Sequence, residues 1–342
     1  MRAEKNRKVY RKDLEDMKRI NPFVEIYKQC NSSSNIEKYN ALCNRENAVP
    51  NYLDIELTNC CNIQCNMCPV GTGIMKRKKG FMSEEVFEKV LEDIKRYHIR
   101  GVRFIRWGEP VLHPRFLEWG GVLKEEGVLV HFNTNGLLLD EEMISKIIEI
   151  KIDSVKFSFQ GIDNLTYGEM RKGGSYTQLL SAIKTMHEMR GEGKTPYISV
   201  TTSITYESEE EVARFKSEVG PYCDEIGVGR TKMQHVDIAR MGLSEERSRI
   251  YEQFMKEDRR NIQHMAVCPE IWDKLSVNWD GSVSACCQDY DNLMLVGDIM
   301  QYDLHEIFCG AKEKYYREIL KNSDYDELIL CRNCYEYIPL KR

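Results

Sequence analysis

The chain has 342 residues, which is enough for one large domain or two of ordinary size. A hydrophobic content of 42% is typical of a globular protein, and a net charge of -5 argues against a nucleic-acid partner. No apolar run approaches the roughly 20 residues that span a bilayer, and the charged N-terminus lacks the apolar segment of a secretory signal. We therefore expect a cytoplasmic protein without a membrane partner.

Residues 1–50 form a polar N-terminal extension in which we expect short helices at residues 13–20 and 22–29 and a turn at residues 31–35. The extension has too few strand signals for a peptide-recognition domain, so we interpret it as a packing arm.

Between residues 51 and 243, short apolar runs alternate with amphipathic segments. The apolar runs predict strands at residues 52–57, 101–107, 128–133, 154–159, 198–204 and 225–229. The amphipathic segments predict helices at residues 83–97, 116–126, 140–150, 176–189 and 209–219. This alternation predicts an α/β fold with a parallel sheet and right-handed crossovers, which places reactive groups at the C-terminal ends of the strands.

Residues 244–342 follow a different pattern, with a long charged helix predicted at residues 244–261 and then a cysteine-rich stretch. We expect a smaller α+β domain that binds a second metal cluster. The chain has 13 cysteines in total, an odd number, and no export signal, so a disulfide framework is a poor explanation for them. Metal clusters are the better use of so many thiols, and they predict sensitivity to oxygen.

The most informative motif is Cys61-x3-Cys65-x2-Cys68. It provides three thiolates where a cubane iron–sulfur cluster needs four ligands, which leaves one iron open to another molecule. The alternatives are a structural zinc site or a redox thiol cluster. Zinc sites are usually closed by paired C-x2-C units, so an odd triplet fits zinc poorly.

The triplet resembles the motif of the radical S-adenosylmethionine (SAM) superfamily. The resemblance implies a partial (β/α)6 TIM barrel, and a [4Fe–4S] cluster whose open iron is chelated by the amino and carboxylate groups of SAM. It further implies reductive cleavage of SAM to a 5′-deoxyadenosyl radical that abstracts hydrogen from a substrate, with a flavodoxin- or ferredoxin-type protein as electron donor.

Further residues match the positions at which this family holds SAM. The segment from Arg106 to Pro110 resembles the GGEP motif, with Trp107 in place of its first glycine, so the resemblance assigns Gly108 and Glu109 to the SAM amino group. The resemblance also assigns Arg171 to the carboxylate of SAM, which a guanidinium suits. The other SAM contacts that it implies lie in a TNG-like loop (Asn135), at the polar end of the fourth strand (Ser158 and Gln160) and near adenine (Met67).

The C-terminal cysteines resemble the SPASM and twitch cluster domains of the same family. Cys268-x12-Gly281-x4-Cys286 matches their opening, and a predicted Asp280-Gly281 hairpin turn brings the two cysteines together. With Cys331 and Cys334, four thiolates close one auxiliary [4Fe–4S] cluster. Cys287 is an alternative to Cys286, zinc is an alternative metal, and the absence of cysteines after Cys334 makes one auxiliary cluster the expectation.

The expected substrate is a sugar, aminosugar or aminocyclitol, by similarity to a twitch-type aminocyclitol dehydrogenase of the family. The favoured outcome is a two-electron oxidation in which the auxiliary cluster accepts an electron. The alternatives are epimerisation, with Cys223 or Cys309 as hydrogen donor, modification of a peptide, and a non-enzymatic iron–sulfur or zinc protein.

Overall fold

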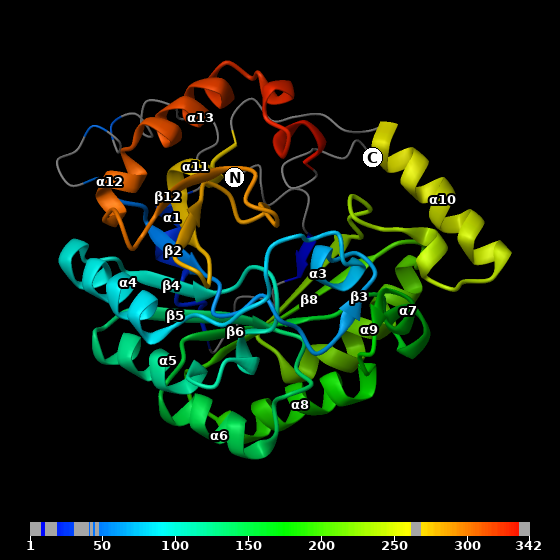
Figure 1. The fold of residues 1–342 in the computed structure, drawn as a ribbon. Helices are drawn as coiled ribbons and strands as arrows, with labels where there is room; N and C mark the ends of the chain where they lie inside the picture. The colour runs from blue at the N-terminus through cyan, green and yellow to red at the C-terminus, as the bar shows by residue number, and fades with distance from the viewer. Residues whose placement is uncertain are drawn as a thin grey trace.

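The computed structural model describes residues 8–10, 19–30, 41, 44, 48–260 and 268–334. Its main feature is a ten-stranded sheet in the order β1-β9-β8-β6-β5-β4-β2-β10-β11-β12 (Figure 1). The six predicted strands are confirmed and pair in parallel. They are β2 (Tyr52–Ile55), β4 (Gly101–Phe104), β5 (Leu129–Thr134), β6 (Ser154–Ser158), β8 (Tyr197–Ile204) and β9 (Glu225–Arg230).

The five predicted helices between these strands are also confirmed, and they cover the outer face of the sheet (Figure 1). Side-chain caps explain where four of them begin: each cap accepts a backbone hydrogen bond from the first helical turn, and the capping residues are Ser83, Asp140, Ser175 and Ser208. The helices are α4 (Glu84–Tyr97), α5 (Phe116–Glu125), α6 (Glu141–Glu149), α8 (Tyr176–Arg190) and α9 (Glu209–Val219).

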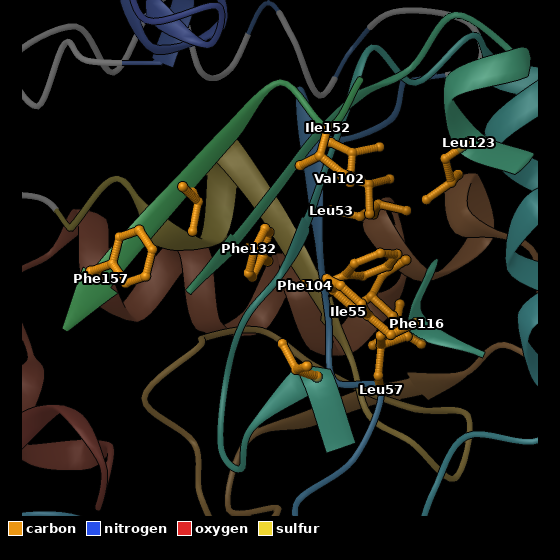
Figure 2. Packing of buried hydrophobic residues seen from close by; sticks show 14 of the residues in the cluster. Leu53, Ile55, Leu57, Val102, Phe104, Phe116, Leu123, Phe132, Ile152 and Phe157 are labelled. Atoms are coloured by element: carbon orange, nitrogen blue, oxygen red, sulfur yellow. The ribbon is translucent and has the colours of Figure 1, made fainter. Parts of the chain in front are cut away.

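The hydrophobic core lies between the sheet and these helices (Figure 2). Alternate residues of β2 and of the segment after it, Leu53, Ile55 and Leu57, are buried in this core beside Phe104 and Phe116. The residues between them point to the other face of the sheet, because side chains alternate along a strand. That inner face is polar.

The N-terminal extension contacts both ends of the barrel sheet. The helix predicted at residues 22–29 is confirmed as α1 (Val24–Cys30), and Phe23 and Ile26 pack with Tyr52 in a small separate cluster. A strand that the sequence did not predict, β1 (Lys8–Tyr10), pairs antiparallel with β9. Residues 11–18 and 31–40, which contain most of the first predicted helix and the predicted turn, lie outside the described residues.

The C-terminal region continues the same sheet. β10 (Lys274–Val277) pairs in parallel with β2, while β11 (Ser282–Ser284) and β12 (Leu295–Asp298) add antiparallel strands. The predicted hairpin is confirmed, and Gly281 at its turn has the positive φ of 87° that glycine tolerates. The helices of this region are α10 (Glu245–Arg260), α11 (Glu270–Asp273), α12 (Leu304–Phe308) and α13 (Ala311–Lys321). None of the helices in the described residues is both long and apolar enough to cross a bilayer.

A buried charge network joins three neighbouring strands on the inner face. Arg103 of β4 donates two hydrogen bonds to the Asp54 carboxylate of β2, at 2.7 and 2.9 Å, and Lys274 Nζ of β10 lies 3.1 Å from Asp54 Oδ2. Burial by itself would raise the pKa of Asp54, but the two cations outweigh it and lower the pKa to about 2. The carboxylate is therefore ionised and holds β4, β2 and β10 together.

Replacement of Asp54 by alanine should lower the free energy of unfolding by about 3–5 kcal/mol, because Arg103 and Lys274 then lose a buried counter-charge. Chemical denaturation of the purified variant measures the change. Asp326→Ala is the matched control, since that side chain is exposed. Equal stability of the two variants would show that the network contributes little.

Candidate active site

The candidate active site is built around Cys61, Cys65 and Cys68, in the loop that follows β2. The three thiols lie close enough to one another to influence their ionisation. Burial, the largest cause, raises the pKa of Cys61 and of Cys65 to about 11, and a neighbouring thiolate of the triplet raises each further. Thiols with such pKa values carry their protons at pH 7, so a metal has to displace the protons when it binds.

Two short elements shape the cysteine loop. The strand β3 (Gln64–Cys65) pairs antiparallel with β7 (Arg171–Lys172), so that Cys65 lies opposite Arg171. The helix α3 (Pro69–Thr72) begins directly after Cys68, and backbone N–H groups of its first turn hydrogen-bond to the Cys68 sulfur. Such N–H groups favour a thiolate ligand at this position.

Arg171 lies beside the cysteines, as the resemblance implied. Its Nη1 is 3.8 Å from the Cys65 sulfur, and its Nη2 donates to the carbonyl of Phe159 at 3.3 Å. Its Nε is buried and has no hydrogen-bond partner among the described residues. A buried donor without a partner, next to the thiol triplet, suits the carboxylate of a bound molecule.

Glu109 provides the complementary acceptor. Gly108 before it has φ of 92°, and a Cβ there would collide with the backbone of the cysteine loop, while the Glu109 amide donates to the Cys60 carbonyl at 2.8 Å. Glu109 Oε2 accepts from the Asn135 amide at 2.8 Å, and Oε1 is buried without a partner in the described part of the chain. Burial raises the pKa of Glu109 to about 7, as expected for a carboxylate that lacks a counter-ion.

Asn135 links this carboxylate to the cysteine loop. Besides the amide contact with Glu109, its side-chain nitrogen donates to Asn62 Oδ1 at 2.7 Å and lies 3.9 Å from the Cys61 sulfur. The structure thus brings together Cys61, Cys65, Cys68, Gly108, Glu109, Asn135 and Arg171.

The other three predicted SAM contacts have different surroundings. Ser158 is half-buried at the C-terminal end of β6, and Gln160 Nε2 donates to the hydroxyl of Thr231, just past β9, at 2.6 Å. Met67 packs against a further hydrophobic cluster that includes Met170 and Tyr251. SAM contacts by Met67, Ser158 and Gln160 stay predictions.

The four predicted auxiliary ligands lie in one region. Burial is the main reason that the pKa of Cys268 is well above its usual value, and the nearby Cys334 and Cys331 raise it further. Burial, with Cys334 adding to it, raises the pKa of Cys331 to about 12. Cys286 accepts a hydrogen bond from the Gln288 amide at 3.4 Å, and Cys268 is among the groups that raise its pKa. Four neighbouring thiols fit a closed iron–sulfur cluster.

A polar network around Cys287 was not predicted from the sequence. The Cys287 thiol donates to Glu270 Oε2 at 3.2 Å and accepts from Lys274 Nζ at 3.3 Å, and ligand atoms of Glu270, Cys286 and Cys287 lie within 4.8 Å of one another. A hydrogen bond with Cys287 is also the largest cause of the raised pKa of Cys286. The choice of Cys286 over Cys287 as the cluster ligand stays a prediction. Glu270 and Lys274 are four residues apart, a helical spacing that signals contact but not function.

The two cysteines proposed as hydrogen donors lie away from the triplet. Cys223 precedes β9, and its thiol donates to the Val219 carbonyl at 3.6 Å. Cys309 ends α12 and donates to the carbonyl of Ala48, ahead of β2, at 3.7 Å. Both lie near the N-terminal ends of strands, whereas the cysteine triplet follows the C-terminal end of β2. These positions do not favour the donor role, which stays a prediction.

Comparison with known families agrees with this geometry. Residues 55–218 match the family model of the radical SAM superfamily, and residues 268–335 match SPASM, an iron–sulfur cluster-binding domain. The chain therefore contains a radical SAM domain, residues 55–218, and a C-terminal SPASM-type domain, residues 268–335. These domains imply SAM with a [4Fe–4S] cluster, and an auxiliary iron–sulfur cluster, and both sets of thiols fit that requirement.

Individual relatives are distant. The chain is 26% identical over 317 residues to a tungsten-containing aldehyde ferredoxin oxidoreductase cofactor-modifying protein of Pyrococcus furiosus, a match that covers 83% of this chain and 86% of that protein. It is 26% identical over 194 residues to the PqqA peptide cyclase of Gluconobacter oxydans, covering 57% of this chain and 51% of the cyclase.

Among solved structures, BtrN in complex with AdoMet and 2-DOIA superposes with a TM-score of 0.53 at 17% identity, covering 85% of this chain and 98% of BtrN. The structure of anSMEcpe with bound AdoMet gives a TM-score of 0.59 at 17% identity, covering 85% of this chain and 88% of that chain. At these identities the likeness establishes the fold.

Anaerobic reconstitution should load about eight iron atoms per chain, as two cubane clusters require. The variant C61A/C65A/C68A should keep about four, and C268A/C286A/C331A/C334A should also keep about four, because each variant removes one ligand set. Iron and sulfide analysis measures the content. Zinc in either site, or loss of all iron from both variants, would contradict two separate clusters.

Glu109→Gln should weaken SAM binding by about 10- to 100-fold, because glutamine keeps the shape but removes the charge that an ammonium group requires. Isothermal titration of the reconstituted protein with SAM measures the dissociation constant. Glu88→Gln, an exposed position on α4, is the control. An unchanged dissociation constant in Glu109→Gln would rule out the ammonium contact.

Proposed function

We propose that this protein is a radical SAM oxidoreductase that removes two electrons from a sugar, aminosugar or aminocyclitol. When bound, SAM and its cluster supply a radical that abstracts a hydrogen atom from carbon, and the auxiliary cluster supplies an electron acceptor. Oxidation of an alcohol to a carbonyl removes one hydrogen atom from carbon, one proton from oxygen and one electron. The chain has to bring all three acceptors to one substrate.

The observation that carries this proposal is direct contact between the Glu109 loop and the loop of Cys286. Arg106 Nη1 donates to the Cys286 carbonyl at 3.4 Å, and its Nη2 donates to the Asp289 carbonyl at 2.6 Å. The indole N–H of Trp107 donates to the same Asp289 carbonyl at 3.3 Å. These bonds fix the loop of Cys286, here called the auxiliary ligand loop, against the loop of Glu109, which is the proposed SAM-binding loop. This contact supports electron transfer from a bound substrate to the auxiliary cluster.

Three aromatic side chains from different loops meet at this contact. Tyr290 packs edge-to-face against Trp107, with ring centroids 6.1 Å apart, and against His235, with centroids 5.0 Å apart. His235 follows β9, so the three rings come from loops after β4, β9 and β11. Burial lowers the pKa of His235 to about 4, so its imidazole is neutral at pH 7 and is only a weak proton acceptor.

The likeness to BtrN gives further support, because the match covers 98% of BtrN, which was solved in complex with AdoMet and 2-DOIA. Modification of a peptide or protein cofactor is the second candidate. It is favoured by the relative in Pyrococcus furiosus, a cofactor-modifying protein that matches over 86% of its length, and by the likeness to SuiB bound to its precursor peptide.

An anaerobic assay in D2O with SAM, dithionite and a panel of aminocyclitols, nucleotide sugars and short peptides tests the proposal. We expect a small polyhydroxylated substrate to give a product two mass units lighter, with one 5′-deoxyadenosine formed for each product. An isomeric product one unit heavier would indicate epimerisation instead. Conversion of peptides alone would favour the second candidate.

A further inference from the structure

A cluster of positive charge follows α3 in a chain whose net charge is -5. The segment from Met75 to Gly80, here called the basic loop, joins α3 to the residues ahead of α4 and contains Lys76, Lys78 and Lys79 (Figure 1). All three lysines are exposed. The fourth cation of the loop, Arg77, is partly buried and forms an ion pair with Glu56.

The basic loop is fixed to both flanks of the cysteine motif. The side chain of Asn59, which is fully buried two residues before Cys61, donates to the Lys78 carbonyl at 2.8 Å and accepts from the Gly80 amide at 2.9 Å. The Met75 amide donates to the carbonyl of Pro69, directly after Cys68, at 3.3 Å. The backbone of the basic loop is therefore held relative to the thiol triplet by hydrogen bonds with the Asn59 side chain and with the Pro69 carbonyl.

The same loop also contacts the auxiliary ligand loop. Asp291 Oδ1 accepts from the backbone amides of Lys76 and Arg77 at 2.7 and 3.0 Å, and Arg77 donates to Asn292 at 3.3 Å. Asp291 lies five residues after Cys286. The lysines thus lie on a segment that bridges the ligand loops of both clusters.

Exposed apolar side chains flank the lysines. Ile74 and Phe81, at the two ends of the basic loop, are 39% and 44% exposed, and Leu293, next to Asn292, is 39% exposed. Electron-transfer complexes use small interfaces, and complementary charge mainly determines how fast such partners meet. Three lysines with apolar neighbours, held against two cluster loops, have the composition that such an interface needs.

We infer that the basic loop is the docking surface for an acidic one-electron carrier protein of the flavodoxin or ferredoxin type. The carrier would give up one electron there, and a cluster held by Cys61, Cys65 and Cys68 would gain it, with no proton or covalent bond transferred. This inference rests on the proposed function only in requiring an external electron donor. The identity of the oxidised substrate does not enter into it.

The test compares two electron sources for the reconstituted holoenzyme, with 5′-deoxyadenosine formation as the readout. A recombinant bacterial flavodoxin, kept reduced by its NADPH-dependent reductase, is one source, and dithionite is the other. The variant K76E/K78E/K79E should raise the KM for flavodoxin at least about tenfold at low salt. Its rate with dithionite should stay within about twofold of wild type, because no cluster ligand has changed.

The matched control is K151E/K194E/K312E, which changes the net charge by the same amount at exposed lysines. Lys151 and Lys194 lie in loops ahead of β6 and β8, at the edge of the sheet opposite the cysteine loop, and Lys312 is on α13. An equal rise in KM for the control would overturn the inference, since total charge would then explain the effect. An unchanged KM in K76E/K78E/K79E would also overturn it.

A second measurement does not depend on turnover. Carbodiimide couples lysine amines to carboxylates across an interface, so mixtures of wild-type holoenzyme and flavodoxin should give cross-links at Lys76, Lys78 or Lys79 in mass spectrometry. Cross-links confined to other lysines would overturn the inference. A protein that cleaves SAM with flavodoxin but oxidises no carbohydrate would refute the proposed function and leave the docking surface intact.

Discussion

Parallel pairing between β2 and β10 is the contact on which the rest of the arrangement depends. It joins a strand near the start of the barrel to one that begins more than 200 residues later, and it makes one sheet of the two cluster-binding regions. β2 leads into the first cysteine loop. Because β11 runs antiparallel to β10, the chain that follows β11 and carries Cys286 returns toward the start of β10, so the pairing places the two cysteine-bearing segments on neighbouring strands. Asp54 strengthens the junction by neutralising Arg103 and Lys274 where backbone pairing alone would leave charges buried.

The loop after β4, which neighbours β2, connects the two cysteine-bearing regions. Arg106 occupies a positive φ of 139°, unusual for a residue with a side chain, and from there its guanidinium reaches carbonyls of the auxiliary loop. Glycine follows at position 108, where the backbone passes too close to the cysteine loop for a side chain. Arg106 thus contacts the auxiliary ligand loop, while Gly108, two residues later, allows the backbone to pass close to the cysteine loop.

Local patterns in the sequence were sufficient for much of the fold. The six strands and five helices of the barrel were predictable because apolar runs and capped amphipathic segments are properties of short windows. The Asp280-Gly281 turn was predictable for the same reason. β1 was missed because Lys-Val-Tyr has no alternation to recognise, and β3 and β7 were missed because two-residue strands form only when residues about a hundred positions apart meet.

The site divides in a similar way. Cysteine spacing and the Gly108-Glu109 pair were visible in the sequence, since they are contiguous motifs. The network of Glu270, Lys274 and Cys287 was not, because its members acquire a common environment only through folding of the hairpin against α11. The same holds for the meeting of Trp107, Tyr290 and His235, which come from three separate loops.

The high pKa values of the triplet have a consequence for how the protein matures. A thiol that retains its proton at neutral pH reacts slowly with oxidants and with disulfides, because the thiolate is the nucleophile. In the absence of a metal the thiols of the triplet are therefore weak nucleophiles at neutral pH. Metal insertion then releases protons to solvent, so cluster assembly is more favourable at mildly alkaline pH than at acidic pH.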